Sequence, residues 1–196
     1  MAFYSSGVEY GIHSLMCMVD SKGDARDMSV REIAELQSVP YDYLAKIFTR
    51  LSKAGLVRSI EGKGGGFQLA KPAEHITVLD VVNAIDGDKR IFECREIRQR
   101  LAVFEEHPPE WACEGICGVR SVMDMAQQRM EEALGQHTIL DLARKMYRKA
   151  HGSGLHLREE DAGIKGRCVY MHGLPFIPHS GQMLTDSGQC GTCREL

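Results

Sequence analysis

The stretch from residue 29 to residue 69 constrains the fold of this chain most, because two short helical patterns lead directly into two short strand patterns. Ser29 and Glu32 have the spacing of a capping box and predict the start of a short helix, and the same pairing recurs at Thr77 and Asp80. A second helix is predicted after the first, where apolar residues recur at helical spacing. These residues are Leu44, Ile47, Phe48 and Leu51.

The strands are predicted at residues 56–60 and 67–69, on either side of the glycine-rich stretch 61–66. An ordinary mobile hairpin would have the same pattern. Because the two strands follow directly after two helices, we favour a wing beside a helix-turn-helix unit. The stretch lacks the Gly-Lys-Ser/Thr ending of a nucleotide-binding P-loop. The expected fold class is therefore mainly α with a small β-hairpin wing, a winged helix-turn-helix plus a long dimerisation helix.

The local charge of this region fits a DNA-reading surface, although the charge of the whole chain does not. The formal net charge is −3, whereas five basic residues stand against one acidic residue between Lys46 and Lys63. A local surplus of this kind is enough to contact phosphates. The residues expected near the bases are Tyr41, Asp42, Ala45, Lys46 and Thr49. The residues expected at phosphates or in the minor groove are Arg50, Arg58 and Lys63.

A longer helical pattern begins at Gly118 and ends at Gly135, with apolar residues at alternating steps of four and three. Steps of this kind are typical of the seam between paired helices. The seam residues are Val119, Met123, Ala126, Met130 and Ala133. We expect a homodimer that reads a palindromic operator. The alternative is packing against the first helix of the same chain, which is predicted from Val8, Ile12, Leu15 and Val19 and ends near Asp20.

Four regions are expected along the chain. Residues 1–87 form the winged helix-turn-helix DNA-binding domain, and residues 88–117 form a cluster-binding loop. Residues 118–150 contain the dimerisation helix and a short terminal helix that ends at residue 146. Residues 151–196 are rich in glycine and lack periodicity, which predicts a disordered tail. The tail contains Cys168, Cys190 and Cys193, and a lone Cys-x-x-Cys is a weak signal of a metal or redox site.

The loop before the long helix holds three cysteines, Cys94, Cys113 and Cys117. The chain has seven cysteines, no signal-peptide pattern and no apolar run of membrane-spanning length, so we expect a cytoplasmic protein with thiols or metal ligands. Thiolates favour zinc or iron–sulfur centres, and three cysteines leave a usual set of four ligands incomplete. Glu9 and His13 share one helix face and could complete the set of metal ligands. The alternative is that the two side chains only contact each other in solvent.

Several motifs resemble the Rrf-type winged-helix regulators, the family of IscR and NsrR. They occupy residues 43–48, 55–59, 62–67, 76–82 and 84–87. Within the family, the chain is most similar to the redox-sensing branch typified by RsrR. The closer similarity is carried by Gly-Val-Glu-Tyr-Gly-Ile-His at residues 7–13, by residues 94–100, and by residues 108–117 with Pro-Pro-Glu and Cys-Glu-Gly-Ile-Cys.

This resemblance implies a 2Fe–2S cluster held across the dimer, with Glu9 and His13 of one subunit and Cys113 and Cys117 of the other as ligands. Cys94 is a possible further ligand or a thiol of the core. The expected function is a DNA-binding transcriptional regulator whose operator affinity is controlled by the redox-responsive cluster. The alternative is a cluster-free regulator in which Cys113 and Cys117 act as a thiol switch. The sequence contains no nucleophile-base arrangement that points to an enzyme.

Overall fold

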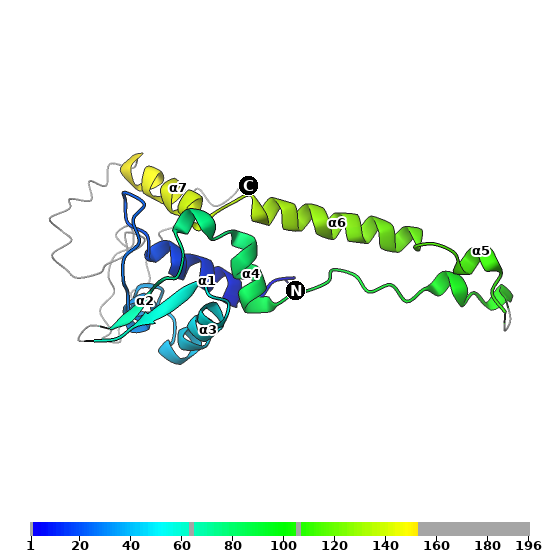
Figure 1. Cartoon of the computed structure of the whole chain (residues 1–196), viewed down its shortest axis with the longest axis horizontal. Helices are drawn as coiled ribbons and strands as arrows, with labels where there is room; N and C mark the ends of the chain where they lie inside the picture. Colours follow the sequence, from blue (N-terminus) through cyan, green and yellow to red (C-terminus); the bar gives the residue numbers. More distant parts are fainter. Residues whose placement is uncertain (1, 63–64, 105–106, 153–196) are drawn as a thin grey trace, which may run out of the picture.

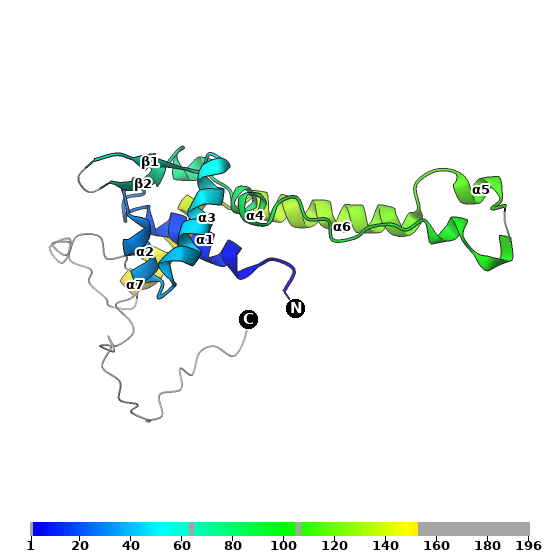
Figure 2. The same ribbon diagram turned by 90° about the horizontal axis from the view of Figure 1, so that it is seen from below.

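The computed structural model describes residues 2–62, 65–104 and 107–152, and consists of a winged-helix body from which a long arm projects (Figure 1, Figure 2). The elements of the body are α1 (Ser6–Cys17), α2 (Val30–Leu36), α3 (Tyr41–Lys53), β1 (Val57–Ile60), β2 (Gly66–Leu69), the 3-10 turn η1 (Ala73–His75) and α4 (Val78–Asp86). β1 and β2 pair antiparallel, with Val57 opposite Leu69. The predicted fold class, mainly α with a β-hairpin wing, is therefore confirmed.

Two helices of the body begin at capping boxes that the sequence predicts. At the start of α2, the Ser29 hydroxyl accepts from the Glu32 N–H over 3.2 Å, and the Glu32 carboxylate accepts from the Ser29 N–H over 2.8 Å. Thr77 and Asp80 make the same pair of bonds at α4, over 2.9 and 3.0 Å. Each box satisfies two backbone N–H groups that a helix start leaves unpaired. Local sequence therefore decides where these helices begin.

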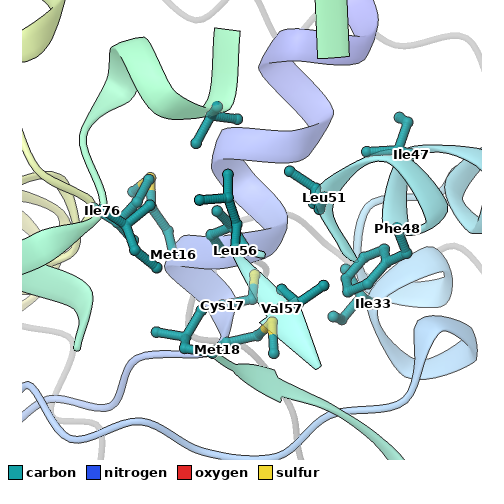
Figure 3. Close-up of a cluster of buried hydrophobic side chains, with 14 of the residues drawn as sticks. Met16, Cys17, Met18, Ile33, Ile47, Phe48, Leu51, Leu56, Val57 and Ile76 are labelled. Carbon is teal, nitrogen blue, oxygen red and sulfur yellow. The ribbon is translucent and has the colours of Figure 1, made fainter. Parts of the chain in front are cut away.

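The body is held by one apolar core to which α1, α2, α3, β1 and α4 contribute (Figure 3). The side chains labelled in Figure 3 are Met16, Cys17, Met18, Ile33, Ile47, Phe48, Leu51, Leu56, Val57 and Ile76. Gly11 allows α1 to approach α4 closely, because a Cβ at this position would overlap the Ile85 side chain. The core thus holds α1 directly against α3 and α4.

The arm leaves the body after α4 and returns along α6 (Gly118–Gly135). Its far end contains the 3-10 turns η2 (Ile97–Gln99) and η3 (Ala102–Phe104) and the short helix α5 (Glu110–Cys113). The outgoing chain runs beside α6 in both views, and the Ile91 N–H donates to the Gln127 side-chain oxygen over 3.3 Å (Figure 1, Figure 2). With 18 residues, α6 spans about 27 Å at 1.5 Å per residue.

The last described helix, α7 (Ile139–Gly152), returns to the body and packs against α1. The sequence predicts its end at residue 146, but the helix continues to Gly152. Tyr147 explains the extension, because its ring is buried and its hydroxyl donates to the Val19 carbonyl over 2.9 Å. Residues 147–151 also contain neither glycine nor proline to stop the helix.

The predicted tail, with Cys168, Cys190 and Cys193, falls within residues 153–196, which lie outside the described residues. Among the residues that the structure describes, no helix combines the length and the apolar character needed to cross a membrane.

Candidate DNA interface and metal centre

The outer face of α3 carries the residues predicted to read bases. Tyr41, Asp42, Lys46 and Thr49 are exposed, and Ala45 is half-buried. The opposite face of α3 packs into the core through Leu44, Ile47, Phe48 and Leu51. This division leaves a continuous polar helix face available for a major groove.

Arg31 on α2 lies next to this face of α3, and the sequence analysis did not predict it. The centre of its guanidinium group lies 5.5 Å from the centre of the Tyr41 ring, which is a cation–π contact. Both side chains are exposed. Only the fold brings the two residues together, so the sequence pattern of either helix gave no signal for this contact.

The predicted phosphate contacts have different surroundings. Arg50 donates through Nη1 to the Ile85 carbonyl over 2.7 Å, so it also joins α3 to the end of α4. Arg58 is exposed on β1, where it pairs across the hairpin with Gln68. Lys63, predicted at the tip of the wing, lies outside the described residues.

At the far end of the arm, two of the predicted cysteines come together. One ligand atom each from Cys94, Glu96 and Cys117 lie within 4.8 Å of one another, and all three residues are half-buried. Two thiols and a carboxylate at this spacing are a donor set that suits a soft or borderline metal. Glu96 was not predicted as part of a site. Its spacing of two residues from Cys94 is a sequence signal that could have indicated it.

Arg98 organises this tip, and the sequence analysis did not single it out. Its Nε donates to the Glu96 carboxylate over 3.0 Å. Its Nη1 and Nη2 donate to the carbonyl oxygens of Glu114 and Gly115 over 2.8 and 2.6 Å. One guanidinium group therefore ties the outgoing chain next to Cys94 to the loop that leads into Cys117.

The two thiols differ in their electrostatic surroundings. The pKa of Cys117 is lowered, chiefly by the backbone N–H of Arg120 and further by the N–H of Val119 and by Cys94. Cys117 precedes α6, where the free N–H groups and the helix dipole favour a thiolate. For Cys94, the N–H of Glu96 favours the thiolate, but desolvation and the negative charges of Cys117 and Glu96 outweigh it and raise its pKa.

The remaining predicted ligands lie elsewhere. Cys113 is exposed at the end of α5 and is not in the group that Cys94 and Cys117 form. Glu9 is exposed and His13 half-buried on α1, one helical turn apart. Figure 1 shows α1 in the body and α5 with the start of α6 at the opposite end of the molecule. Within one chain, the predicted ligands therefore form two separate sets.

The fold and the α3 surface define a winged-helix DNA-binding protein. The model of the Rrf2 family, described as "Iron-dependent Transcriptional regulator", matches residues 4–145. The chain belongs to the Rrf2 family of transcriptional regulators. The predicted family resemblance is thereby confirmed, and the narrower similarity to the RsrR branch stays a prediction.

Individual relatives agree with this assignment. The chain is 34% identical over 137 residues to Protein rrf2 of Nitratidesulfovibrio vulgaris, covering 69% of this chain and 83% of that protein. It is 29% identical over 116 residues to the HTH-type transcriptional regulator NsrR of Bacillus subtilis, covering 59% of this chain and 73% of that one.

Among solved structures, CymR, the global cysteine regulator of B. subtilis, is similar with a TM-score of 0.54 and 26% identity, covering 73% of this chain and 97% of CymR. NsrR and CymR are both described as regulators. The chain is accordingly a DNA-binding transcriptional regulator, as the sequence predicts.

Proposed function

We propose that the chain is a homodimeric regulator whose affinity for a palindromic operator is controlled by a 2Fe–2S cluster held between two subunits. The observation that carries the proposal is the arm, which holds soft thiol donors far from the Glu9 and His13 pair on α1. A site that uses both sets needs a second copy of the chain, because one chain separates them.

The surface of the arm supports the dimer. Among its described residues, α6 has none that is fully buried within the chain. Val119, Val122 and Met125 are 61%, 58% and 54% exposed, although all three are apolar. A long helix with an exposed apolar surface of this kind favours pairing with a second helix, because apolar area leaves water on association. Pairing through α6 would also place two α3 helices on one palindromic site.

The donors fit the proposed cofactor. Cys117 and a second cysteine would supply thiolates from the tip, and Glu9 and His13 would supply harder oxygen and nitrogen atoms from the partner's α1. Cys113 is the second cysteine that the resemblance implies, and the position of Cys94 beside Cys117 makes Cys94 an equally direct choice. The family description as iron-dependent also favours iron over zinc at this site.

A bound cluster of this type supplies a centre that takes up or gives up one electron. The residues of the chain would transmit that change in charge to the DNA surface. Glu9 and His13 stand on α1, and α1 packs against α3 and α4. The Ser6 hydroxyl also lies 3.3 Å from the Tyr43 hydroxyl of α3. A shift of α1 would thus reach the DNA-reading helix directly.

Anaerobic purification tests the proposal. The protein should be red-brown and contain about one 2Fe–2S cluster per subunit. Cys117→Ala should lose the cluster, and Glu9→Ala or His13→Ala should alter its spectrum. Comparing Cys94→Ala with Cys113→Ala identifies the second thiolate ligand. Operator affinity should differ between the oxidised and the reduced protein.

The same experiment separates the proposal from the thiol-switch alternative. A colourless, iron-free protein that still binds its operator, and releases it when Cys113 and Cys117 are oxidised, would replace the cluster with a cysteine switch. In that case the winged-helix surface would keep its role, because it does not depend on what the tip binds.

A further inference from the structure

We infer that Cys94 and Cys117 form an intrachain disulfide when the tip of the arm holds no cluster, so that the tip is a reversible dithiol. The inference starts from their positions, because one ligand atom of each, together with one of Glu96, lies within 4.8 Å of the others. Cys113, the sequence neighbour of Cys117, is not in that group. The pair that the fold brings together thus differs from the pair that is close in sequence.

The chain around the two thiols is already held in place for this bond. Arg98, four residues after Cys94, donates to the carbonyls of Glu114 and Gly115, just before Cys117. Because this clamp joins the two segments independently of the thiols, little further chain entropy is lost when the sulfurs bond. A disulfide needs the sulfurs at about 2.05 Å, so side-chain rotation and a small shift of the loop complete the approach.

A small oxidant can reach the pair. Both cysteines are half-buried on the arm and lie outside the core of the body. Cys94 lines an open cavity of about 350 Å³ together with Arg90 and Arg120. Glu93 and Asp124 line the same cavity and balance the two guanidinium groups, so the cavity admits a small disulfide by its size and not by its charge.

The reaction balances as two thiol–disulfide exchanges. The thiolate of one cysteine attacks a small disulfide, which forms a mixed disulfide and releases one small thiolate. The second cysteine then attacks the mixed disulfide, forms the Cys94–Cys117 bond and releases the second small thiolate. The two protein thiols are oxidised by two electrons, the small disulfide is reduced to two thiols, and the two protons pass to the released thiolates.

A consequence for regulation rests on the proposed function. Oxidised sulfurs cannot act as thiolate ligands, so the disulfide would block cluster assembly until a thiol reductant reopened it. The empty tip would then be protected from irreversible oxidation to sulfinic acid, because its thiols would be stored in a reversible form.

The test uses the full-length, cluster-free protein and glutathione disulfide as the oxidant. After blocking of the remaining thiols, digestion with trypsin and a glutamate-specific protease separates the three cysteines, because Arg95, Glu114 and Arg120 lie between or beside them. Mass spectrometry should find Cys94 joined to Cys117 within one chain. Cys94→Ser and Cys117→Ser should each lose this cross-link completely, and the matched control Cys113→Ser should retain it.

Several outcomes would overturn the inference. These are a bond between Cys113 and Cys117, a stable mixed disulfide with glutathione on Cys94 or Cys117, a link between two chains, or full alkylation of both thiols. Reconstitution with ferrous iron and sulfide, before and after reduction, tests the consequence separately. If the cross-link forms but no protein state takes up a cluster, the proposed function fails and the disulfide stands.

Discussion

Arg98 donates through Nη2 to the carbonyl oxygen of Gly115 over 2.6 Å, and this bond joins the two halves of the arm tip. The same side chain reaches the Glu114 carbonyl and the Glu96 carboxylate. Two backbone carbonyls and a carboxylate thus accept hydrogen bonds from one guanidinium group, whose donors have a fixed planar arrangement. The order of the tip therefore depends on one residue that is not itself a candidate ligand.

Arg98→Ala should loosen the tip without unfolding the body. Loss of these bonds costs about 1.5 kcal/mol locally, so amide hydrogens in residues 94–117 should exchange roughly tenfold faster. Hydrogen exchange with mass spectrometry measures the effect segment by segment. Arg95→Ala is the matched control, because Arg95 is an exposed neighbour. Equal exchange in the two variants would show that the clamp is dispensable.

Ala126→Glu should convert the proposed dimer into monomers. Ala126 is exposed in the predicted seam of α6, so a charge there would be buried only in the dimer, where it is costly. Light scattering after size-exclusion chromatography measures the mass, and circular dichroism should show an unchanged fold. Asp124→Lys changes a charge at an exposed position on the face of α6 away from Val119 and Val122, and this variant should remain dimeric. A dimeric Ala126→Glu protein would move the interface away from this seam.

Arg58→Ala should weaken DNA binding at every sequence and lower the salt dependence. Arg58 is exposed on β1, and loss of one phosphate contact reduces the slope of log K against log salt by about 0.9. Lys63→Ala tests the wing in the same way. Lys149→Ala on α7 serves as the control, since α7 lies on the other side of the body from α3 in Figure 1. A slope identical to wild type would exclude the altered residue from phosphate contact.

Asp86 should make the folded state sensitive to acid. Its side chain is 5% exposed, and its carboxylate accepts from the Ser5 N–H and from Lys89, each over 2.7 Å. Burial alone raises the pKa of Asp86, but the bonds from Lys89 and Ser5 and the charge of Lys89 outweigh it, so the pKa is lowered. A carboxyl with a lowered folded pKa stabilises fully above its ordinary value of about 3.9, and this stability is lost as the pH falls toward the folded value.

Asp86→Asn should therefore lower the free energy of unfolding at pH 7 by about 1–3 kcal/mol, because a charged acceptor is lost. The difference from wild type should shrink as the pH falls below about 4. Urea unfolding at a series of pH values measures both effects. Asp88→Asn, at an exposed position, should follow wild type throughout. A constant difference between Asp86→Asn and wild type would mean that the effect is not electrostatic.

Local signals in the sequence predicted much of this architecture. The capping pair of Ser29 and Glu32 and the glycines that bound α6 act within a few residues, so they are readable without the fold. The hairpin strands are predicted on either side of a glycine-rich stretch, and the structure shifts the start of each strand by one residue and leaves its end unchanged. The predicted end of α7 at residue 146 was wrong, because the contact of Tyr147 with Val19 joins residues far apart in the chain.

The candidate metal site also depends on contacts between residues that are far apart in the chain. The family resemblance implied Cys113 and Cys117 as the pair of cysteine ligands, whereas the path of the arm brings Cys94 and Glu96 to Cys117 within one chain. Arg98 was overlooked because its partners are backbone carbonyls, which have no sequence signature.

The sequence by itself determined that the chain is a winged-helix regulator with a cysteine-rich loop and a long helix, because helix caps, periodicity and family motifs are local properties. The tertiary structure alone decided which thiols meet, which side chain orders them, and that they lie at the opposite end of the molecule from Glu9 and His13. Those outcomes depend on where an extended segment and an 18-residue helix carry their ends in space, and spacing along a chain does not specify that direction.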